Sequence, residues 1–220
     1  MIKNLLNKNK PKIFCISFQR TGTTSTGDFF KSLDYNVANY FCSKRNRWSV
    51  KWNNGDYESI FKSPDFINNQ VFEDDPWWCG DFYRYLFHRF PESKFVLLVR
   101  DSDKWFDSML NHSGGMSLGN SLRHARVYRR ESEFYKINSG FNINDYNERS
   151  NDCLLPLAGK SEHYKKIYEI RNNEIISYFN KYGKERLFYS TLEDQDKWVK
   201  MGVFFDKKIS VKSIFHSNKS

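Results

Sequence analysis

Apolar residues form short continuous runs that are separated by segments of helical spacing. The two clearest runs are residues 13–18 ("IFCISF") and 94–100 ("KFVLLVR"), and a loop or capping residues follow each of them. Such runs are typical of strands buried in a parallel sheet. Shorter strands are predicted at residues 69–76, which end at Pro76, and at residues 186–194 ("RLFYSTLED").

Helical spacing of apolar residues predicts a helix after most of these strands. The predicted helices cover residues 24–35, 80–91, 101–112, 162–183 and 195–205. Strands separated by helices predict an α/β fold: a single three-layer domain with a central, mainly parallel sheet flanked by helices. The length of 220 residues fits one such domain, spanning residues 1–220.

Three segments lack this pattern. Residues 1–11 are predicted to be a basic N-terminal extension, and residues 39–69 a loop-rich or short-helical excursion. Residues 113–160 contain glycine-rich breaks and the arginine cluster "RHARVYRR" at 123–130, so an inserted helical and loop segment is predicted.

The formal net charge of +9 favours an anionic partner such as nucleic acid, an anionic membrane or a nucleotide, although solvated lysines account for part of the excess. Basic residues are spread along the whole chain and no nucleic-acid motif is present, which argues against nucleic acid as a partner. No apolar run is long enough for a transmembrane segment and no secretory signal is visible, so a cytoplasmic location is expected.

Four cysteines lie far apart, without a C-x-x-C pair or a histidine at metal-ligand spacing. They are predicted to be free thiols, and no zinc site is expected.

The segment "QRTGTTS" (residues 19–25) stands between the first predicted strand and a helix, where backbone amides and hydroxyls can bind an anion. A Walker A loop needs a lysine that is absent here, and the cation in this loop is Arg20. Taken alone, the motif is weak because short Gly-Thr-Thr strings occur in ordinary loops. The candidate anion ligands are Arg20, Thr21, Gly22, Thr23, Thr24 and Ser25.

A second candidate element is "RDSDKWFDS", which starts with Arg100 at the carboxyl end of a predicted strand. Ligands of open α/β sheets bind at this end. Ser108 follows eight residues later on the next predicted helix, where it is able to face the same crevice. Arg100 and Ser108 would suit a second phosphate. The alternative is that Arg100 pairs with a nearby aspartate and that Ser108 is an ordinary surface residue.

Together these motifs make the chain resemble the sulfotransferase superfamily, whose donor is 3′-phosphoadenosine 5′-phosphosulfate (PAPS). "QRTGTTS" is similar to the family's 5′-phosphosulfate loop, and "RDSDKWFDS" to its 3′-phosphate motif. "DDPWWCGDFYRYLFHRFPESKFVLLVR" and, more loosely, the C-terminal half and the final "IFHSNKS" extend the resemblance over most of residues 12–218. It implies a fold like that of the P-loop nucleotide-binding proteins.

The resemblance implies transfer of a sulfonate group from PAPS to an acceptor hydroxyl or amine, with PAP as the product and no metal. Arg20 would stabilise charge on the leaving oxygen, since it stands in place of the family's loop lysine. The base would come from "VFEDDP": Glu73 and Asp75 are favoured equally, and Asp74 less. Structural roles for these carboxylates, as helix caps or partners of Arg84 or Arg89, stay open.

Other readings also stay open. A small-molecule or nucleotide kinase would need the missing lysine and a magnesium-binding aspartate. A basic nucleic-acid-binding module and a sulfotransferase that binds PAP without turnover are further alternatives. The acceptor, whether a glycan, a small alcohol or phenol, a lipid or a peptide tyrosine, is not determined. A concentration of tryptophans, which either contact the acceptor or pack in the core, comprises Trp48, Trp52, Trp77 and Trp78.

Overall fold

The computed structural model describes residues 11–112, 122–140 and 155–209. Its contacts divide the chain into two compact units. The first unit consists of Met1–Arg100 and Glu174–Ser220, and the second of Asp101–Asn173.

The first unit contains a parallel sheet with the strand order β2-β3-β1-β4-β5. The strands are β1 (Ile13–Cys15), β2 (Val37–Ala38), β3 (Val71–Phe72), β4 (Lys94–Val99) and β5 (Leu187–Thr191). Every strand pair is parallel, so all carboxyl ends lie at one edge. β2 and β3 lie on one side of β1, and β4 and β5 lie on the other. The order of the strands therefore reverses at β1, which makes its carboxyl end a topological switch point. The predicted α/β class with a mainly parallel sheet is confirmed.

Helices α2 (Thr23–Lys31) and α12 (Lys197–Phe204) cover one face of the sheet. The side chains of Ile13 and Cys15 point to this face because residues two apart in a strand share a face. Phe29 of α2 stacks on Trp198 of α12 with their ring centroids 5.5 Å apart, which joins the two helices over the strands.

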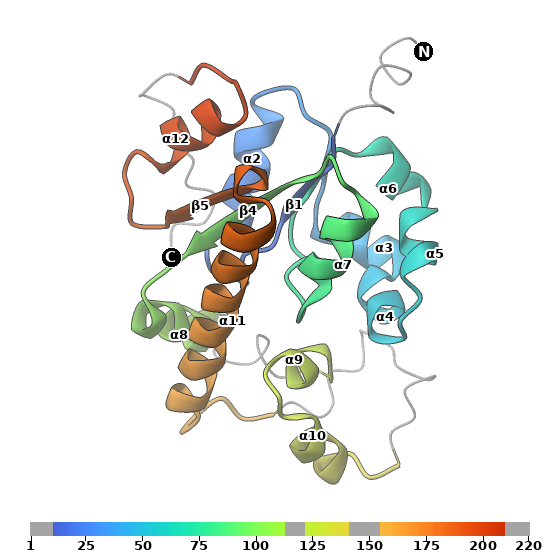
Figure 1. The fold of residues 1–220 in the computed structure, drawn as a ribbon. Coiled ribbons are helices and arrows are strands. Elements are labelled where there is room, and N and C mark those ends of the chain that lie inside the picture. Colours follow the sequence, from blue (N-terminus) through green and yellow to red (C-terminus); the bar gives the residue numbers. More distant parts are fainter. Residues whose placement is uncertain (1–10, 113–121, 141–154, 210–220) are drawn as a thin grey trace. The chain divides into compact units, whose positions relative to one another are not determined.

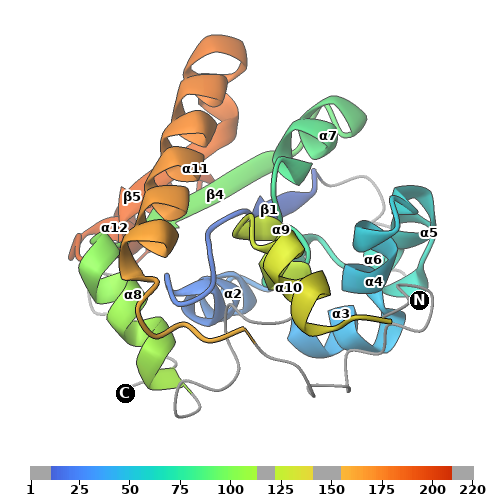
Figure 2. The same ribbon diagram turned by 90° about the horizontal axis from the view of Figure 1, so that it is seen from below.

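The opposite face carries α7 (Phe82–Arg89) and the C-terminal part of α11 (Ser161–Tyr182). In Figures 1 and 2, α7 and α11 lie on the other side of β4 from α2. Phe14, which alternates with Ile13 and Cys15, packs on Trp77 with a centroid distance of 5.3 Å. Phe95 of β4 packs on Phe179 of α11 at 4.9 Å. The aromatic residues of this face therefore form a second core layer.

Residues 39–69 form four short helices, in agreement with the short-helical alternative. They are α3 (Tyr40–Asn46), α4 (Trp48–Asn53), α5 (Tyr57–Phe61) and α6 (Pro64–Asn68). Side-chain oxygens of Asn39, Asp56 and Ser63 accept backbone N–H bonds at the starts of α3, α5 and α6. The strand β2, which precedes α3, was not predicted because two residues are too few to show a pattern.

The second unit contains α8 (Ser102–Asn111), α9 (Leu122–Val127), α10 (Glu131–Ile137) and the first part of α11. Trp105 of α8 stacks on Tyr168 of α11 with centroids 4.2 Å apart. The predicted insertion at 113–160 and the extension at 1–11 fall partly outside the described residues, and their boundaries remain predictions.

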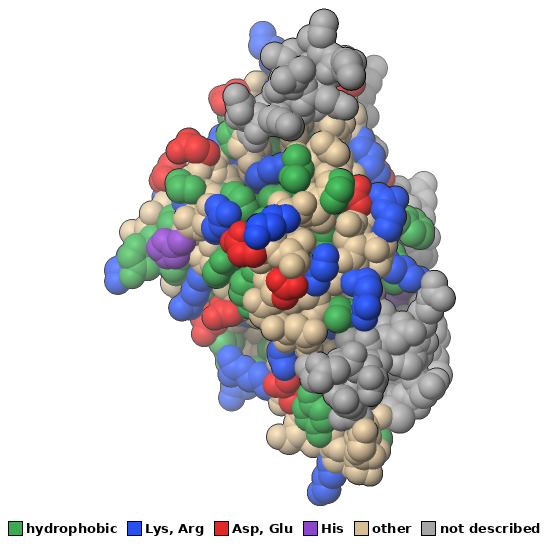
Figure 3. Space-filling model, turned by 90° about the vertical axis from the view of Figure 1, so that its right-hand side faces the viewer, with side chains coloured by type: hydrophobic (Ala, Val, Ile, Leu, Met, Phe, Trp, Pro, Cys, Tyr) green, Lys and Arg blue, Asp and Glu red, His purple; other side chains and the backbone are tan. Residues whose placement is uncertain are grey.

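The cysteines in the described part of the chain form no disulfide. Cys15 and Cys79 are buried free thiols, Cys42 is a half-buried one, and Cys153 lies outside the described residues. Lysine and arginine side chains alternate with acidic ones on the face in Figure 3, which is the right-hand side of Figure 1. Across residues 11–112, 122–140 and 155–209, no helix is long and apolar enough to cross a membrane.

Candidate active site

The loop after β1 is tied to β4 before it turns. The backbone N–H of Ile16 donates to the carbonyl oxygen of Val96 at 2.9 Å, and the backbone N–H of Leu98 donates to Ser17 Oγ at 2.7 Å. Residues 16–19 stay buried although β1 ends at Cys15, three residues earlier than the predicted strand. The first half of the loop therefore continues along the sheet to its carboxyl edge.

The loop then turns through left-handed backbone conformations. Arg20 has φ 66° and Gly22 has φ 85°, and Gly22 is the N-cap residue of α2. The buried Thr21 donates its hydroxyl to the carbonyl oxygen of Phe18 at 2.5 Å. Thr21 thus holds the turn with its hydroxyl. Beyond the turn, the first amides of α2 have no carbonyl partner within the helix, which is the usual arrangement of a helix-terminal anion site.

Gly22 is required for space as well as for conformation. A Cβ atom at this position would lie 2.8 Å from Leu192 Cδ1 and would have to adopt the left-handed conformation. We expect Gly22→Ala to lower the free energy of unfolding by about 2–3 kcal/mol, in urea denaturation, from backbone strain plus crowding.

Gly55→Ala is the matched control for this prediction, since Gly55 has φ 75° and nothing within 4 Å of its added Cβ. Gly55→Ala should lower the free energy of unfolding by only about 1–2 kcal/mol, which is the cost of the left-handed backbone alone. Equal losses in the two variants would contradict the contact with Leu192 as a constraint on the loop.

Two arginines lie at the carboxyl edge of the sheet, Arg20 in the loop after β1 and Arg100 directly after β4. Burial, and then the nearby positive charge of Arg100, lower the pKa of Arg20. Arg100 directly follows β4, and its Nε atom lies 3.8 Å from Oε1 of Glu193, just beyond β5. Like charges brought together at a strand edge favour binding of an anion between or beside them. This edge also carries the amides of the loop.

The acidic residues near Arg100 in the sequence have other partners. Asp101 caps α8 by accepting the backbone N–H of Lys104 at 3.0 Å, and Asp103 pairs with Lys165 at 2.8 Å. Arg100 forms its ion pair with Glu193 and not with Asp101 or Asp103. Ser108 lies on α8 in the second unit and is half-buried.

Three consecutive carboxylates follow β3, and Glu73 is the most unusual of them. Glu73 is 5% exposed. Burial, with a smaller effect from Asp74, raises its pKa to about 8. Gly27 of α2 lies against this carboxyl group, and a Cβ at Gly27 would lie only 2.6 Å from Glu73 Cδ. Glu73 Oε2 is buried without a hydrogen-bond partner among the described residues.

The two neighbours of Glu73 have different surroundings. Asp75 is 2% exposed and accepts a hydrogen bond from the indole nitrogen of Trp78 at 2.7 Å. Asp74 is half-buried and has a left-handed backbone with φ 70°. Asp74 is therefore the carboxylate of the three with the most solvent access.

Most of the remaining candidates serve the packing of their own unit. The four tryptophans at 48, 52, 77 and 78 are buried, and Trp48 and Trp77 are 5.4 Å apart between ring centroids. In the arginine cluster at 123–130, Arg126 pairs with Glu131 at 2.8 Å, and the buried Arg130 pairs with Glu133 at 2.6 Å. Arg130 is thus part of the interior of the second unit and not of a solvated helix face.

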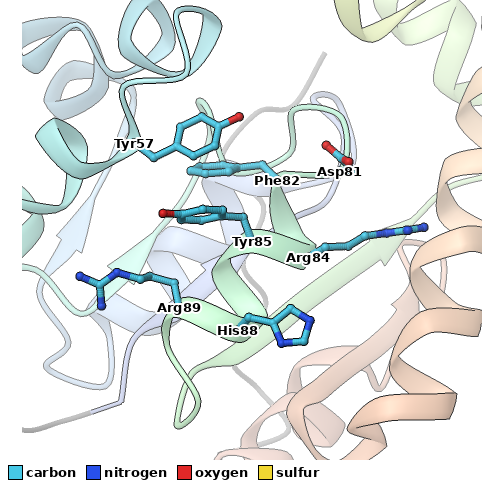
Figure 4. Close-up of a pocket in the computed structure, with 7 residues that line it drawn as sticks. All are labelled: Tyr57, Asp81, Phe82, Arg84, Tyr85, His88 and Arg89. Atoms are coloured by element: carbon cyan, nitrogen blue, oxygen red, sulfur yellow. The ribbon is translucent and has the colours of Figure 1, made fainter.

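A separate pocket of about 530 Å³ is lined by residues of α7, by Asp81 just before it and by Tyr57 of α5. Figure 4 shows its lining residues, Tyr57, Asp81, Phe82, Arg84, Tyr85, His88 and Arg89, with the three aromatic rings grouped together. Arg89 is paired with Glu58 at 3.1 Å, and the His88 ring nitrogen lies 3.0 Å from the Tyr178 hydroxyl. The pocket contains none of the predicted site residues.

Sequence reasoning missed Gly27, Leu192 and Glu193, which shape the loop and its charges. A signal for two of them was present, because Leu192 and Glu193 lie at the carboxyl end of the predicted strand 186–194, where ligand-binding residues of parallel sheets gather. Gly27 carried no such signal. The predicted His216 and Asn218 in "IFHSNKS" lie outside the described residues.

These features define a parallel α/β protein whose switch point carries a glycine-containing loop with a cationic residue, Arg20, before a helix. A family model described as a sulfotransferase domain matches residues 12–220, so the chain belongs to this family. A search among curated proteins finds no match. No group of three or more His, Cys, Asp or Glu side chains in the described part of the chain could hold a metal ion.

Proposed function

We propose that this member of the sulfotransferase family transfers a sulfonate group from PAPS to a hydroxyl or amine of an acceptor and releases PAP. The observation that carries the proposal is the loop after β1, where Arg20 and Gly22 take left-handed conformations before the first turn of α2, with Arg100 directly after the neighbouring strand β4. Two cations and a row of backbone amides suit a donor with phosphates at two positions. Family membership supports sulfonate transfer in general, and the PAPS donor is our assignment.

Each part of the donor has its proposed ligands in this chain. The 5′-phosphosulfate would be bound by the loop residues Arg20, Thr21, Gly22, Thr23, Thr24 and Ser25. Thr24 is exposed, and Thr23 and Ser25 are half-buried, so their hydroxyls are accessible. The 3′-phosphate would be bound by Arg100, with Ser108 assigned from its position in the motif.

Arg20 is proposed to stabilise the transition state. The acceptor oxygen forms a bond to sulfur while the bond from sulfur to the bridging oxygen breaks, and PAP leaves with the bonding electron pair. Negative charge grows on that bridging oxygen, and a fixed guanidinium beside it lowers the barrier. Arginine stays protonated in proteins, so Arg20 would act through its charge and not as a proton donor.

A carboxylate after β3 is proposed to take the proton of the acceptor. The sequence favoured Glu73 and Asp75, but Asp75 is held by Trp78 and Glu73 is covered by α2. A base must come within hydrogen-bond distance of the acceptor. The greater exposure of Asp74 therefore favours it as the base, with Glu73 and Asp75 as supporting groups.

Calorimetric titration with PAP, and separately with ATP and magnesium, tests the donor. We expect micromolar binding of PAP and little binding of ATP, because the loop lacks the lysine that contacts the terminal phosphates of ATP. A preference for ATP with magnesium would overturn the proposal in favour of a kinase. PAP binding without turnover on any acceptor would indicate a form that binds the nucleotide only.

A further inference from the structure

One carboxylate lies among the groups that are proposed to bind the donor. Glu193 comes two residues after the end of β5, the edge strand that pairs with β4 (Figure 1). Its Oε1 atom is 3.8 Å from Nε of Arg100, which is the residue proposed to bind the 3′-phosphate. A negative charge at this place opposes the binding of another negative charge. The position of Glu193 therefore bears directly on the affinity for the donor and for PAP.

The backbone just before Glu193 is fixed both to β4 and to the loop after β1. The backbone N–H of Leu192 donates to the carbonyl oxygen of Val99 at 2.6 Å. The Leu192 side chain lies against the loop, since a Cβ atom added to Gly22 would be only 2.8 Å from Leu192 Cδ1. Glu193 thus extends from a fixed backbone at the carboxyl edge of the sheet.

The residue after Glu193 is also held in place. Ser190 Oγ donates to Asp194 Oδ2 at 3.1 Å, and the Lys200 ammonium lies 2.6 Å from the same oxygen. The charge of Asp194 is therefore balanced within the turn after β5, whereas the charge of Glu193 is directed at Arg100.

The pair of Arg100 and Glu193 is weak enough to be exchanged for a phosphate. Their side chains are 28% and 41% exposed, and the distance of 3.8 Å is longer than that of a hydrogen bond. An ion pair of this kind contributes little free energy. A phosphate dianion offers the same guanidinium more charge and more acceptor oxygens than a carboxylate does, so it is the stronger partner.

We infer that Glu193 is a competing counterion of Arg100, which limits the affinity for PAP and thereby speeds the release of this product. The inference rests on the proposed function. In the free protein the Arg100 guanidinium faces the Glu193 carboxylate. When PAP binds, the guanidinium turns to the 3′-phosphate and the carboxylate stays nearby as a like charge. Glu193 takes no part in bond making, and its effect is on how long PAP stays bound.

Glu193→Gln tests the inference, because it removes the charge and keeps the shape. We expect PAP to bind this variant about tenfold more tightly than the wild type, mainly through slower dissociation, as measured by calorimetry and stopped-flow displacement. Glu193→Asp keeps the charge and should stay within about threefold of the wild type. Since the Glu193 side chain is partly exposed, both variants should fold, which circular dichroism checks.

Salt separates an effect of charge from one of shape. The gain of about tenfold should be seen at about 0.01 M salt and fall to about twofold at about 1 M, because the Debye length shrinks from about 30 Å to about 3 Å. Glu58→Gln is the matched control: Glu58 lies on α5 and is paired with Arg89, and both side chains are 46% exposed. This control makes the same change in net charge and should bind PAP with the affinity of the wild type at both salt concentrations.

The other outcomes contradict the inference in different ways. Equal PAP affinities of the wild type and Glu193→Gln would show that the carboxylate does not compete. Weaker binding by Glu193→Gln would show that Glu193 orients Arg100 for the phosphate, and a gain that is independent of salt would assign the effect to shape. Failure of the wild type to bind PAP would overturn the donor assignment as well, so failure of the proposed function is distinguishable from failure of this inference alone.

Discussion

Arg100→Ala is expected to weaken PAP binding by about 100-fold or more, because a buried phosphate would lose its charged partner. The fold should survive, since the partner left behind, Glu193, has a side chain that is 41% exposed and can be solvated. Calorimetry gives the affinity, and circular dichroism with thermal unfolding confirms that the variant is folded.

Arg89→Ala is the control for Arg100→Ala. Arg89 is also an arginine paired with a glutamate, Glu58, but it lies at the end of α7 and lines the separate pocket there. The Arg89→Ala variant should bind PAP with the affinity of the wild type. A folded Arg100→Ala protein with normal PAP affinity would refute the role of Arg100 and weaken the case for a PAPS donor.

Glu73→Gln is expected to change how stability depends on pH. The pKa of Glu73 is about 8 in the folded protein and 4.5 as the ordinary value, so the folded state holds a proton that the unfolded state releases between these pH values. The stability that this group contributes is complete below pH 4.5 and is lost as the pH rises through about 8. The expected slope is about 1.4 kcal/mol per pH unit.

Urea denaturation at pH 5, 6, 7 and 8 measures this slope. The wild type should lose stability with rising pH relative to Glu73→Gln, whose side chain has nearly the same shape and stays neutral at every pH tested. Glu58→Gln is the control: hydrogen bonds from Arg89 lower the pKa of Glu58, so its contribution is lost at acid pH instead. Parallel curves for the wild type and Glu73→Gln would show that Glu73 is not a buried, protonated group.

Much of the fold could be predicted because its signals are local. β4 is a six-residue apolar run and α11 repeats its apolar residues over 22 positions, and both lie within one or two residues of their predicted bounds. β2 and β3 have two residues each, which is too short for a periodic signal. β3 was found only because Pro76 and the carboxylates end its apolar segment.

The residues of the candidate site that stand in a sequence motif or at a strand end could be predicted. Those whose role depends on contacts between distant segments could not. Arg20 and Arg100 were identified because a loop motif and a strand end mark them. The choice among Glu73, Asp74 and Asp75 depended on side-chain environment, which three adjacent acidic residues do not reveal. Trp78 and Gly27 supplied that environment from positions that carry no chemical signal of their own.

The sequence by itself determined the alternation of strands and helices, the anion loop after β1 and the two arginines, because each depends on residues that are neighbours in the chain. Only the tertiary structure decided that β1 lies between β3 and β4, and hence that Arg20 approaches Arg100 while Glu73 is buried against Gly27. Strand order is set by the packing of both sheet faces at once.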